Sequence, residues 1–319
     1  MNSEFKNYSN LEKAILKVLA FFDIFDYPLT SIEIYKWLYQ PEQIYKLSEI
    51  IEQLDYLNSK NIINFKNGFY FFPGRNDLIN TRLNRYQYAE KKFKLALKAA
   101  KALRWMAFIK MIAVCNNAGY SNANKNSDID FFIVVKKGRL FWSRFMITIA
   151  VQLLGLRRHK QKITNKICLS FYITDDHINL KDIALTPVDP YLIYWFATLS
   201  PIYDRESYTG FMAANSWLDD YLPNFYQTFL SDRRQVKDNK LVKFSYSLDE
   251  KVIKGNLGRF LERFIKKLQL GKMKMNTNSL AKEPDSRVII NDTMLKFHER
   301  DRRDFYRTKW QKKLNSIGL

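Results

Sequence analysis

The run from residue 128 to residue 135, DIDFFIVV, constrains the fold of this 319-residue chain more than any other segment. Six of its eight residues are β-branched or aromatic, and polar residues flank it on both sides. A short apolar run of this composition is typical of a strand that is buried in a sheet. The other two residues are carboxylates, Asp128 and Asp130, which stand at the beginning of the predicted strand.

Two further strands and one helix are predicted around this segment. Residues 108–115 form an apolar run, and the polar loop 116–127 separates it from the central strand. After the central strand, a Lys-Gly-Arg turn leads into a helix over residues 140–156, and residues 167–173 form a third strand. This order of strand, loop, strand, helix and strand predicts a mixed sheet in a protein of the α+β class.

The first 74 residues are predicted to form a helical module. Apolar residues recur at helical spacing over residues 11–25. Thr30 and Glu33 then have the spacing of a capping box, which predicts the start of a short second helix. Residues 44–59 carry a third apolar stripe and are predicted to form a third helix.

The module ends in a predicted β-hairpin. Asn67-Gly68 joins the apolar runs 62–66 and 69–72, and this dipeptide between two such runs is a strong hairpin signal. Three helices followed by a hairpin resemble a winged helix-turn-helix. The third helix is net negative, however, whereas a helix that reads DNA carries basic and amide side chains. We therefore expect a docking or dimerising module without specific DNA binding; a DNA-binding regulator is the alternative that the module alone suggests.

The rest of the chain divides into three predicted regions. Residues 75–186 comprise a long basic helix, residues 75–105, followed by the sheet region. Residues 187–270 are predicted to be helical. Residues 271–319 are predicted to be a basic linker and tail, the end of which forms a helix or remains extended.

The formal net charge of +20 is unevenly distributed along the chain. Residues 60–165 carry a net charge of +17 and residues 232–319 carry +12, whereas residues 1–59 and 166–231 are acidic. Basic segments attract phosphate groups and raise the encounter rate with polyanions, but they do not identify the ligand. A polyanionic partner is therefore expected to contact these two segments.

Asp128 and Asp130 are the residues from which we expect chemistry. Residues two apart in a strand point to the same face, so the two carboxylates are expected to lie about 7 Å apart on one face. Two carboxylates at the start of a buried strand repel each other and lose hydration. A hard cation such as Mg²⁺ or Mn²⁺ removes both penalties and prefers oxygen ligands. The alternative is that the two side chains cap a loop or pair with Lys125 or Arg139.

The surroundings of this pair resemble the polymerase-β-like nucleotidyltransferase superfamily. Its signature is an apolar strand, Gly-Ser, about ten residues, and then Asp-hydrophobic-Asp on the next strand, and the resemblance is concentrated in residues 107–175. The segments FFDIFDYPLT, ICLSFYIT, PYLIYWFATLSPIYD and LKFHERDRRD extend it toward an uncharacterised bacterial group that carries an N-terminal winged helix. The resemblance implies transfer of a nucleoside monophosphate from an NTP to an acceptor hydroxyl or phosphate. Asp128 and Asp130 would be the catalytic metal ligands.

Two departures from the superfamily pattern leave a second interpretation open. Asn116 and Asn117 stand in place of Gly-Ser; with Ser127 they would lie around the triphosphate, and Arg139 would reach it from the following helix. Ser170 occupies the position of a third acidic residue. The resemblance thus implies either a metal-dependent nucleotidyltransferase or a degenerate, non-catalytic protein of this fold that binds nucleotide, RNA or a protein partner.

The sequence carries no signal for a membrane or a disulfide framework. No apolar stretch approaches the ~18 residues that a membrane span needs, and the first residues lack an apolar signal core. Cys115 and Cys168 lie in apolar runs and are expected to be buried, reduced thiols. We expect a cytoplasmic protein with no membrane partner that binds an NTP, with RNA or another polyanion as the candidate acceptor.

Overall fold

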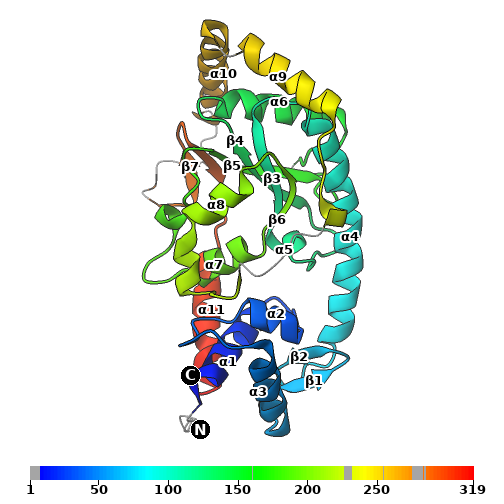
Figure 1. The fold of residues 1–319 in the computed structure, drawn as a ribbon, viewed down its shortest axis with the longest axis vertical. Coiled ribbons are helices and arrows are strands. Elements are labelled where there is room, and N and C mark those ends of the chain that lie inside the picture. Colours follow the sequence, from blue (N-terminus) through cyan, green and yellow to red (C-terminus); the bar gives the residue numbers. More distant parts are fainter. Residues whose placement is uncertain (1–7, 160, 226–231, 254, 275–282, 284) are drawn as a thin grey trace.

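The computed structural model describes residues 8–159, 161–225, 232–253, 255–274, 283 and 285–319. A six-stranded sheet lies at its centre and a helical module at one end of its long axis (Figure 1). The helices α9 (Lys240–Ile253) and α10 (Asn256–Lys274) lie at the other end. No helix within the described residues is long and apolar enough to cross a membrane.

The sheet has the strand order β6-β3-β4-β5-β8-β7. Strands β4 and β5 run parallel, whereas the other neighbouring strands are antiparallel. The mixed sheet and the α+β class predicted from the sequence are therefore confirmed. The strands are β3 (Ile109–Cys115), β4 (Ile129–Val135), β5 (Ile167–Thr174), β6 (Ser200–Asp204), β7 (Val288–Ile290) and β8 (Met294–Phe297).

The three strands predicted from the sequence form the middle of this sheet as β3, β4 and β5. The helix predicted after β4 is α6 (Leu140–Leu153), and the predicted polar loop before β4 contains a short helix, α5 (Asn116–Gly119). A Cβ atom at Gly119 would lie 2.6 Å from the carbonyl oxygen of Thr198. Glycine therefore allows α5 to pack closely against the backbone at Thr198. α5 begins with Asn116, directly after β3.

The outer strands β7 and β8 come from the region predicted to be a linker and tail. β8 pairs with β5, and β7 pairs with β8. These strands are only three and four residues long, too short for an alternating pattern to identify them, and their conformation depends on pairing with β5. Residues 275–282 and 284 of the predicted linker lie outside the described residues.

The N-terminal module contains three helices and a hairpin, in the predicted order. Thr30 and Glu33 form the predicted capping box at the start of the second helix. Asn67 and Gly68, both with positive φ angles, connect the two strands of the hairpin. The elements are α1 (Asn10–Asp23), α2 (Ser31–Lys36), α3 (Leu47–Ser59), β1 (Asn64–Lys66) and β2 (Phe69–Phe71).

The core of this module continues into the rest of the molecule. The ring of Phe22 lies 5.0 Å from that of Tyr194 on α7 (Pro190–Ala197). The indole Nε1 of Trp310 on α11 (Arg303–Ser316) donates to a backbone carbonyl of α1 at 2.9 Å. Buried residues of the module, of α7 and of α11 belong to one hydrophobic cluster. The module therefore packs as part of the same body as the sheet.

Helices cover both faces of the sheet. α4 (Leu78–Leu103), α6 and α10 share a core with the face to which Ile129 and Phe131 point. α7, α8 (Tyr208–Ala214), α11 and the N-terminal module share a core with the opposite face, to which Phe132 points. Since side chains alternate along a strand, Asp130 lies on the same face as Phe132.

The long basic helix α4 connects the module to the sheet. Near its start, Arg82 pairs with Glu33 at 2.7 Å. In its middle, the buried Lys92 donates to the carbonyl oxygen of Ser127 at 2.7 Å. Basic side chains of α4 are thus bonded within the molecule, and one of them holds the chain directly before β4.

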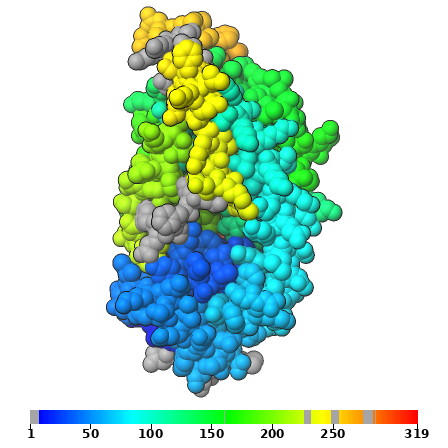
Figure 2. All heavy atoms as spheres, turned by 45° about the vertical axis from the view of Figure 1, so that its right-hand side comes forward, coloured from blue at the N-terminus to red at the C-terminus, as the bar shows by residue number. Residues whose placement is uncertain are grey.

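The segment that follows residue 232 covers part of the surface beside α4. Arg234 pairs with Glu90, and Arg104 donates to the carbonyl oxygen of Lys237 at 2.7 Å. Figure 2 shows this segment (yellow) along α4 (cyan) as it leads into α9. The basic surface predicted for α4 is therefore partly covered by the chain itself.

Candidate functional site

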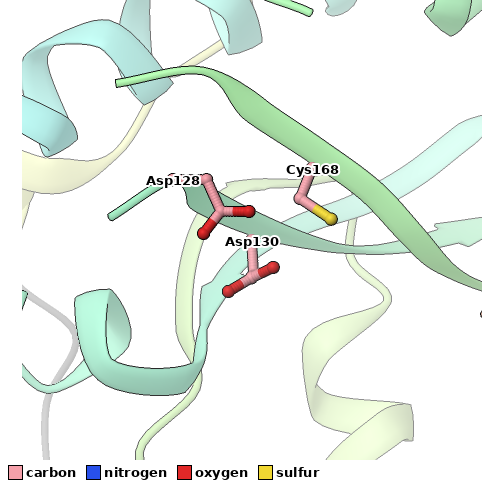
Figure 3. A group of neighbouring side chains, drawn as sticks. All are labelled: Asp128, Asp130 and Cys168. Carbon is pink, nitrogen blue, oxygen red and sulfur yellow. The ribbon is translucent and has the colours of Figure 1, made fainter. Parts of the chain in front are cut away.

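The two predicted carboxylates lie side by side at the beginning of β4 (Figure 3). One oxygen of Asp128, one oxygen of Asp130 and Sγ of Cys168 all lie within 4.8 Å of one another. Ile129 and Phe131 are fully buried on the opposite face of the sheet. The prediction that Asp128 and Asp130 share one face is confirmed.

Asp128 is held by an arginine that the sequence pattern does not reveal. Nη1 of Arg158 lies 2.6 Å from Oδ2 of Asp128 and 3.4 Å from Sγ of Cys168. The backbone N–H of Arg158 donates to the carbonyl oxygen of Ile167 at 3.0 Å, so the chain after α6 runs beside the start of β5. This contact brings Arg158 to the carboxylate across 30 residues of sequence.

Asp130 is held by an asparagine from the preceding strand–loop junction. Nδ2 of Asn116 donates to Oδ2 of Asp130 at 2.8 Å, and the hydroxyl of Tyr191 donates to Oδ1 of Asn116 at 3.4 Å. Asn116 has a φ angle of 55°, in the left-handed region that asparagine adopts more readily than most residues. The amide of Asn116 therefore orients the carboxylate of Asp130. The sequence had instead led us to expect it beside the triphosphate.

Burial and the neighbouring charge of Asp128 raise the pKa of Asp130 to about 6. The hydrogen bond from Asn116 and the charge of Arg158 oppose this shift without cancelling it. Two carboxylates this close therefore carry an electrostatic cost near neutral pH, which a cation between them would remove.

Both cysteines flank Asp130 in the sheet. Cys115 pairs with it from β3, and Cys168 pairs with it from β5. Cys115 is buried, as predicted, but Cys168 is only half-buried and faces the cavity described next. Burial raises the pKa of the Cys168 thiol to about 12, so it is protonated at neutral pH.

Asp130 opens into a cavity of about 640 Å³ on the α7 face of the sheet. One wall is formed by the beginnings of β4 and β5, with Asp130, Cys168 and Ser170. α7 contributes Tyr191 and Trp195. A further wall consists of residues 296–303, from the end of β8 to the start of α11. This segment belongs to the region predicted to be a linker and tail.

Ser170 and His298 both line this cavity and contact each other. Their Oγ and Nε2 atoms lie 3.2 Å apart. The pairing of β4 with β5 shifts register between Asp130 and residue 132, so that β5 holds one extra residue and both Ser170 and Phe171 face the cavity. Burial, with the charge of Lys296, lowers the pKa of His298 to about 4, and the ring is therefore neutral at neutral pH.

Three residues predicted to contact a triphosphate do not line this cavity. Asn117 accepts a hydrogen bond from the hydroxyl of Tyr120 at 2.8 Å, and Ser127 donates to a backbone carbonyl within its own turn. Arg139 follows the opposite end of β4, where its guanidinium lies 5.2 Å from the centre of a phenylalanine ring. A strand of seven residues spans about 20 Å, so Arg139 cannot act beside Asp130. The expectation that Arg139 reaches a triphosphate bound beside Asp130 is therefore wrong.

The acidic residues that follow β5 lie equally far from the pair. Asp175 accepts from the backbone N–H of Lys137 at 2.8 Å, and Asp176 pairs with the Lys137 side chain at 2.9 Å. Within the part of the chain that the structure describes, no third carboxylate joins the group of Asp128, Asp130 and Cys168. Ser170, which the resemblance placed at the position of a third acidic residue, lines the cavity.

A buried network of ion pairs holds the C-terminal wall in place. Arg303 bonds Asp189 at 2.9 Å and Asp301 at 2.8 Å, and Lys296 lies 3.2 Å from Asp301. Arg303, Asp189 and Lys296 are 6%, 3% and 3% exposed. Asp189 also accepts from the backbone N–H of Leu192 and so caps α7. The same network thus fixes residues 296–303 and the aromatic helix that forms the back of the cavity.

Known proteins do not identify this site. No family model, no curated protein and no solved structure matches the chain. Its chemistry therefore has to be inferred from the residues of the cavity themselves.

Proposed function

We propose that the chain is a metal-dependent nucleotidyltransferase that moves a nucleoside monophosphate from an NTP to an acceptor. One observation carries this proposal: Asp128 and Asp130 have carboxylate oxygens within 4.8 Å of each other, and Asp130 lines a cavity that basic and aromatic side chains also line. Carboxylates alone would repel a triphosphate. A divalent cation bound between them would reverse the sign of that interaction.

The donor atoms fit a hard cation. Asp128 and Asp130 supply carboxylate oxygens, which Mg²⁺ and Mn²⁺ prefer, and the neighbouring thiol of Cys168 is protonated at neutral pH. When bound, such a cation would neutralise charge that develops on the transferring phosphoryl group. Arg158 already neutralises part of the charge on Asp128 and would remain beside the phosphates.

The reaction itself needs positioning more than covalent chemistry. The acceptor oxygen forms a bond to the α-phosphorus, the bond from that phosphorus to the bridging oxygen breaks, and pyrophosphate leaves with the electron pair. The proton of the acceptor hydroxyl passes to solvent or to a base. The residues of the cavity would hold the two reactants in line.

The test is calorimetric titration of each of the four NTPs in the presence of Mg²⁺ and in the presence of EDTA. We expect binding that depends on Mg²⁺ in the parent and is lost when Asp128→Asn and Asp130→Asn are combined. The matched control combines Asp175→Asn and Asp176→Asn, which removes two carboxylates at the other end of β5. Binding to the first double variant as tight as to the parent would refute the site.

A non-catalytic protein that binds nucleotide, RNA or a protein partner is the second candidate. The ion pair of Asp128 with Arg158 and the serine at position 170 favour it, because both reduce the number of carboxylates that are free to act. Incubation with α-labelled NTPs and a panel of tRNA, protein and small-molecule acceptors distinguishes the two. A labelled product with equimolar pyrophosphate supports transfer, whereas Mg²⁺-dependent binding without product supports the second candidate.

A further inference from the structure

The cavity needs groups that bind phosphate, and the residues expected to do so lie elsewhere. Asn117, Ser127 and Arg139 do not line it, and Asn116 is bonded to Asp130. The cations of the cavity come from other positions. They are Arg158, Lys296, Arg300, Arg302 and Arg303, four of which belong to the segment that forms the C-terminal wall.

Three of these five cations have partners within the protein. Arg158 pairs with Asp128, and the buried Lys296 and Arg303 share Asp301. A cation that is buried in an ion-pair network cannot leave it for a ligand without exposing an unpaired charge. These three cations therefore contribute to the positive electrostatic potential of the cavity. Because their ion-pair partners already use some of their N–H donors, they cannot bind phosphate through all of them.

Arg300 and Arg302 differ from the other three. Both are exposed, both line the cavity, and neither has an ion-pair partner among the residues that the structure describes. They alternate with the two anchored residues Asp301 and Arg303 along the chain. The backbone is therefore anchored on both sides of Arg302 and directly after Arg300, so that a ligand has little of it to order on binding.

We propose that Arg300 and Arg302 bind the polyphosphate group of the NTP, in place of the Gly-Ser turn that the superfamily pattern has after its first strand. Guanidinium groups match phosphate oxygens with paired hydrogen bonds. Because the aromatic rings of Tyr191 and Trp195 line the same cavity, the ligand class is a polyphosphate that carries an aromatic ring. This inference rests on the proposed function in one respect, namely that the bound polyphosphate is a substrate of the reaction.

The experiment measures the affinity of inorganic tripolyphosphate and of ATP for the full chain, in EDTA and in Mg²⁺. We expect Arg300→Gln and Arg302→Gln each to weaken both ligands by about 10-fold, and the double variant by about 100-fold, because each removes charge-assisted hydrogen bonds. The matched control combines R259Q and R263Q, two exposed arginines of α10 that do not line the cavity. It should bind both ligands as the parent does.

The EDTA arm separates this inference from the proposed function. A loss of tripolyphosphate binding in EDTA that only the Arg300 and Arg302 variants show supports the arginine site, whatever the carboxylates do. Mg²⁺-dependent ATP binding that these variants retain overturns the arginine site and leaves the carboxylate site standing. No tripolyphosphate binding by the parent in either buffer overturns the inference as well. A single-stranded RNA oligonucleotide is a further probe. A loss of affinity confined to this RNA also overturns the inference, because the arginines would then contact an acceptor.

The expected loss must come from the ligand and not from unfolding. Arg300 and Arg302 are exposed and unpaired among the described residues, so their replacement should leave the thermal midpoint of unfolding unchanged. Adenosine, which lacks phosphates, serves as a second probe. Its affinity should be the same for the parent and the double variant, and an equal loss for adenosine and ATP would contradict a role in phosphate binding.

Discussion

The two walls of the cavity differ in how the sequence encodes them. The sheet wall carries Asp130 near the beginning of β4, two residues after Asp128, and its position follows from a continuous apolar run. The C-terminal wall, residues 296–303, carries its cations beside a strand of only four residues and is held by ion pairs with residues up to 114 positions away. One site thus combines a half that the local sequence encodes with a half that exists only after folding.

The two walls also differ in charge and in what stabilises them. The sheet wall has a carboxylate, Asp130, whose raised pKa reports an electrostatic cost. The C-terminal wall has the buried cations Lys296 and Arg303, which pair with carboxylates, although burial still lowers the pKa of Lys296 to about 8. Removal of the charge on Asp130 should therefore raise the free energy of unfolding, whereas removal of the charge on Arg303 should lower it.

Arg303→Met should have the largest effect. It leaves Asp189 and Asp301 without their shared guanidinium in a buried setting, and loss of one partner of a buried pair typically costs about 3–5 kcal/mol. The free energy of unfolding, measured by urea denaturation, should fall by that amount. The control is Arg302→Met at the exposed neighbouring position, which should change it by less than about 0.5 kcal/mol. Equal effects at the two positions would remove the distinction between anchoring and exposed arginines.

Asp130→Asn should act in the opposite direction. Because the pKa of Asp130 is raised to about 6, the charged carboxylate disfavours the folded state above that pH, and its replacement should add about 2 kcal/mol to the free energy of unfolding at pH 8. Below pH 6 the folded parent protonates Asp130 and the cost fades, so most of the gain should be gone by pH 4. Asp175→Asn serves as the control and should show no such gain; a gain at Asp130 that did not change with pH would contradict the electrostatic cause.

His298→Gln should have an effect about as large as that of Asp130→Asn, but one confined to mildly acidic pH. The pKa of His298 is lowered to about 4, so the folded parent resists a proton that the unfolded chain accepts from about pH 6.5 downward. Stability of the parent should therefore fall as the pH decreases from 6.5 to 4, and the variant should lack about 2 kcal/mol of that fall.

The groups that face His298 remain charged in both proteins and cancel in this comparison. They are Lys296, Asp301 and Arg303, and Ser170 keeps a hydrogen-bond partner in glutamine. His159→Gln, at an exposed position, is the control and should follow the parent. Identical pH profiles for the parent and the His298 variant would show that the ring is not buried against these cations.

The sequence predicts the centre of the fold well because its signals are local. The strands that became β3, β4 and β5, the helix α6 and the capping box at Thr30 and Glu33 all depend on patterns within a few residues. The shared face of Asp128 and Asp130 follows from the period of a strand. The assignment of Arg139 to the site is wrong because proximity in sequence to a strand places a residue at one of its ends, and Arg139 follows the other end.

The partners of the two carboxylates could not be predicted from the sequence. Arg158 reaches Asp128 only because the chain after α6 pairs with β5, and His298 reaches Ser170 only because β8 joins the same sheet. Neither contact has a local pattern, since each joins single side chains from segments that pair through their backbones. A bulge in β5 likewise decides that Ser170 and Phe171 both face the cavity.

The buried strand, the pair of carboxylates at its beginning and the excess of positive charge in two segments can all be read from the sequence. Apolar periodicity and residue spacing encode these features within a few positions. Only the tertiary structure decided which positive charges belong to the cavity. The side chains that meet there come from β4, β5, α7 and residues 296–303, and long-range pairing and buried ion pairs, not composition, bring those segments together.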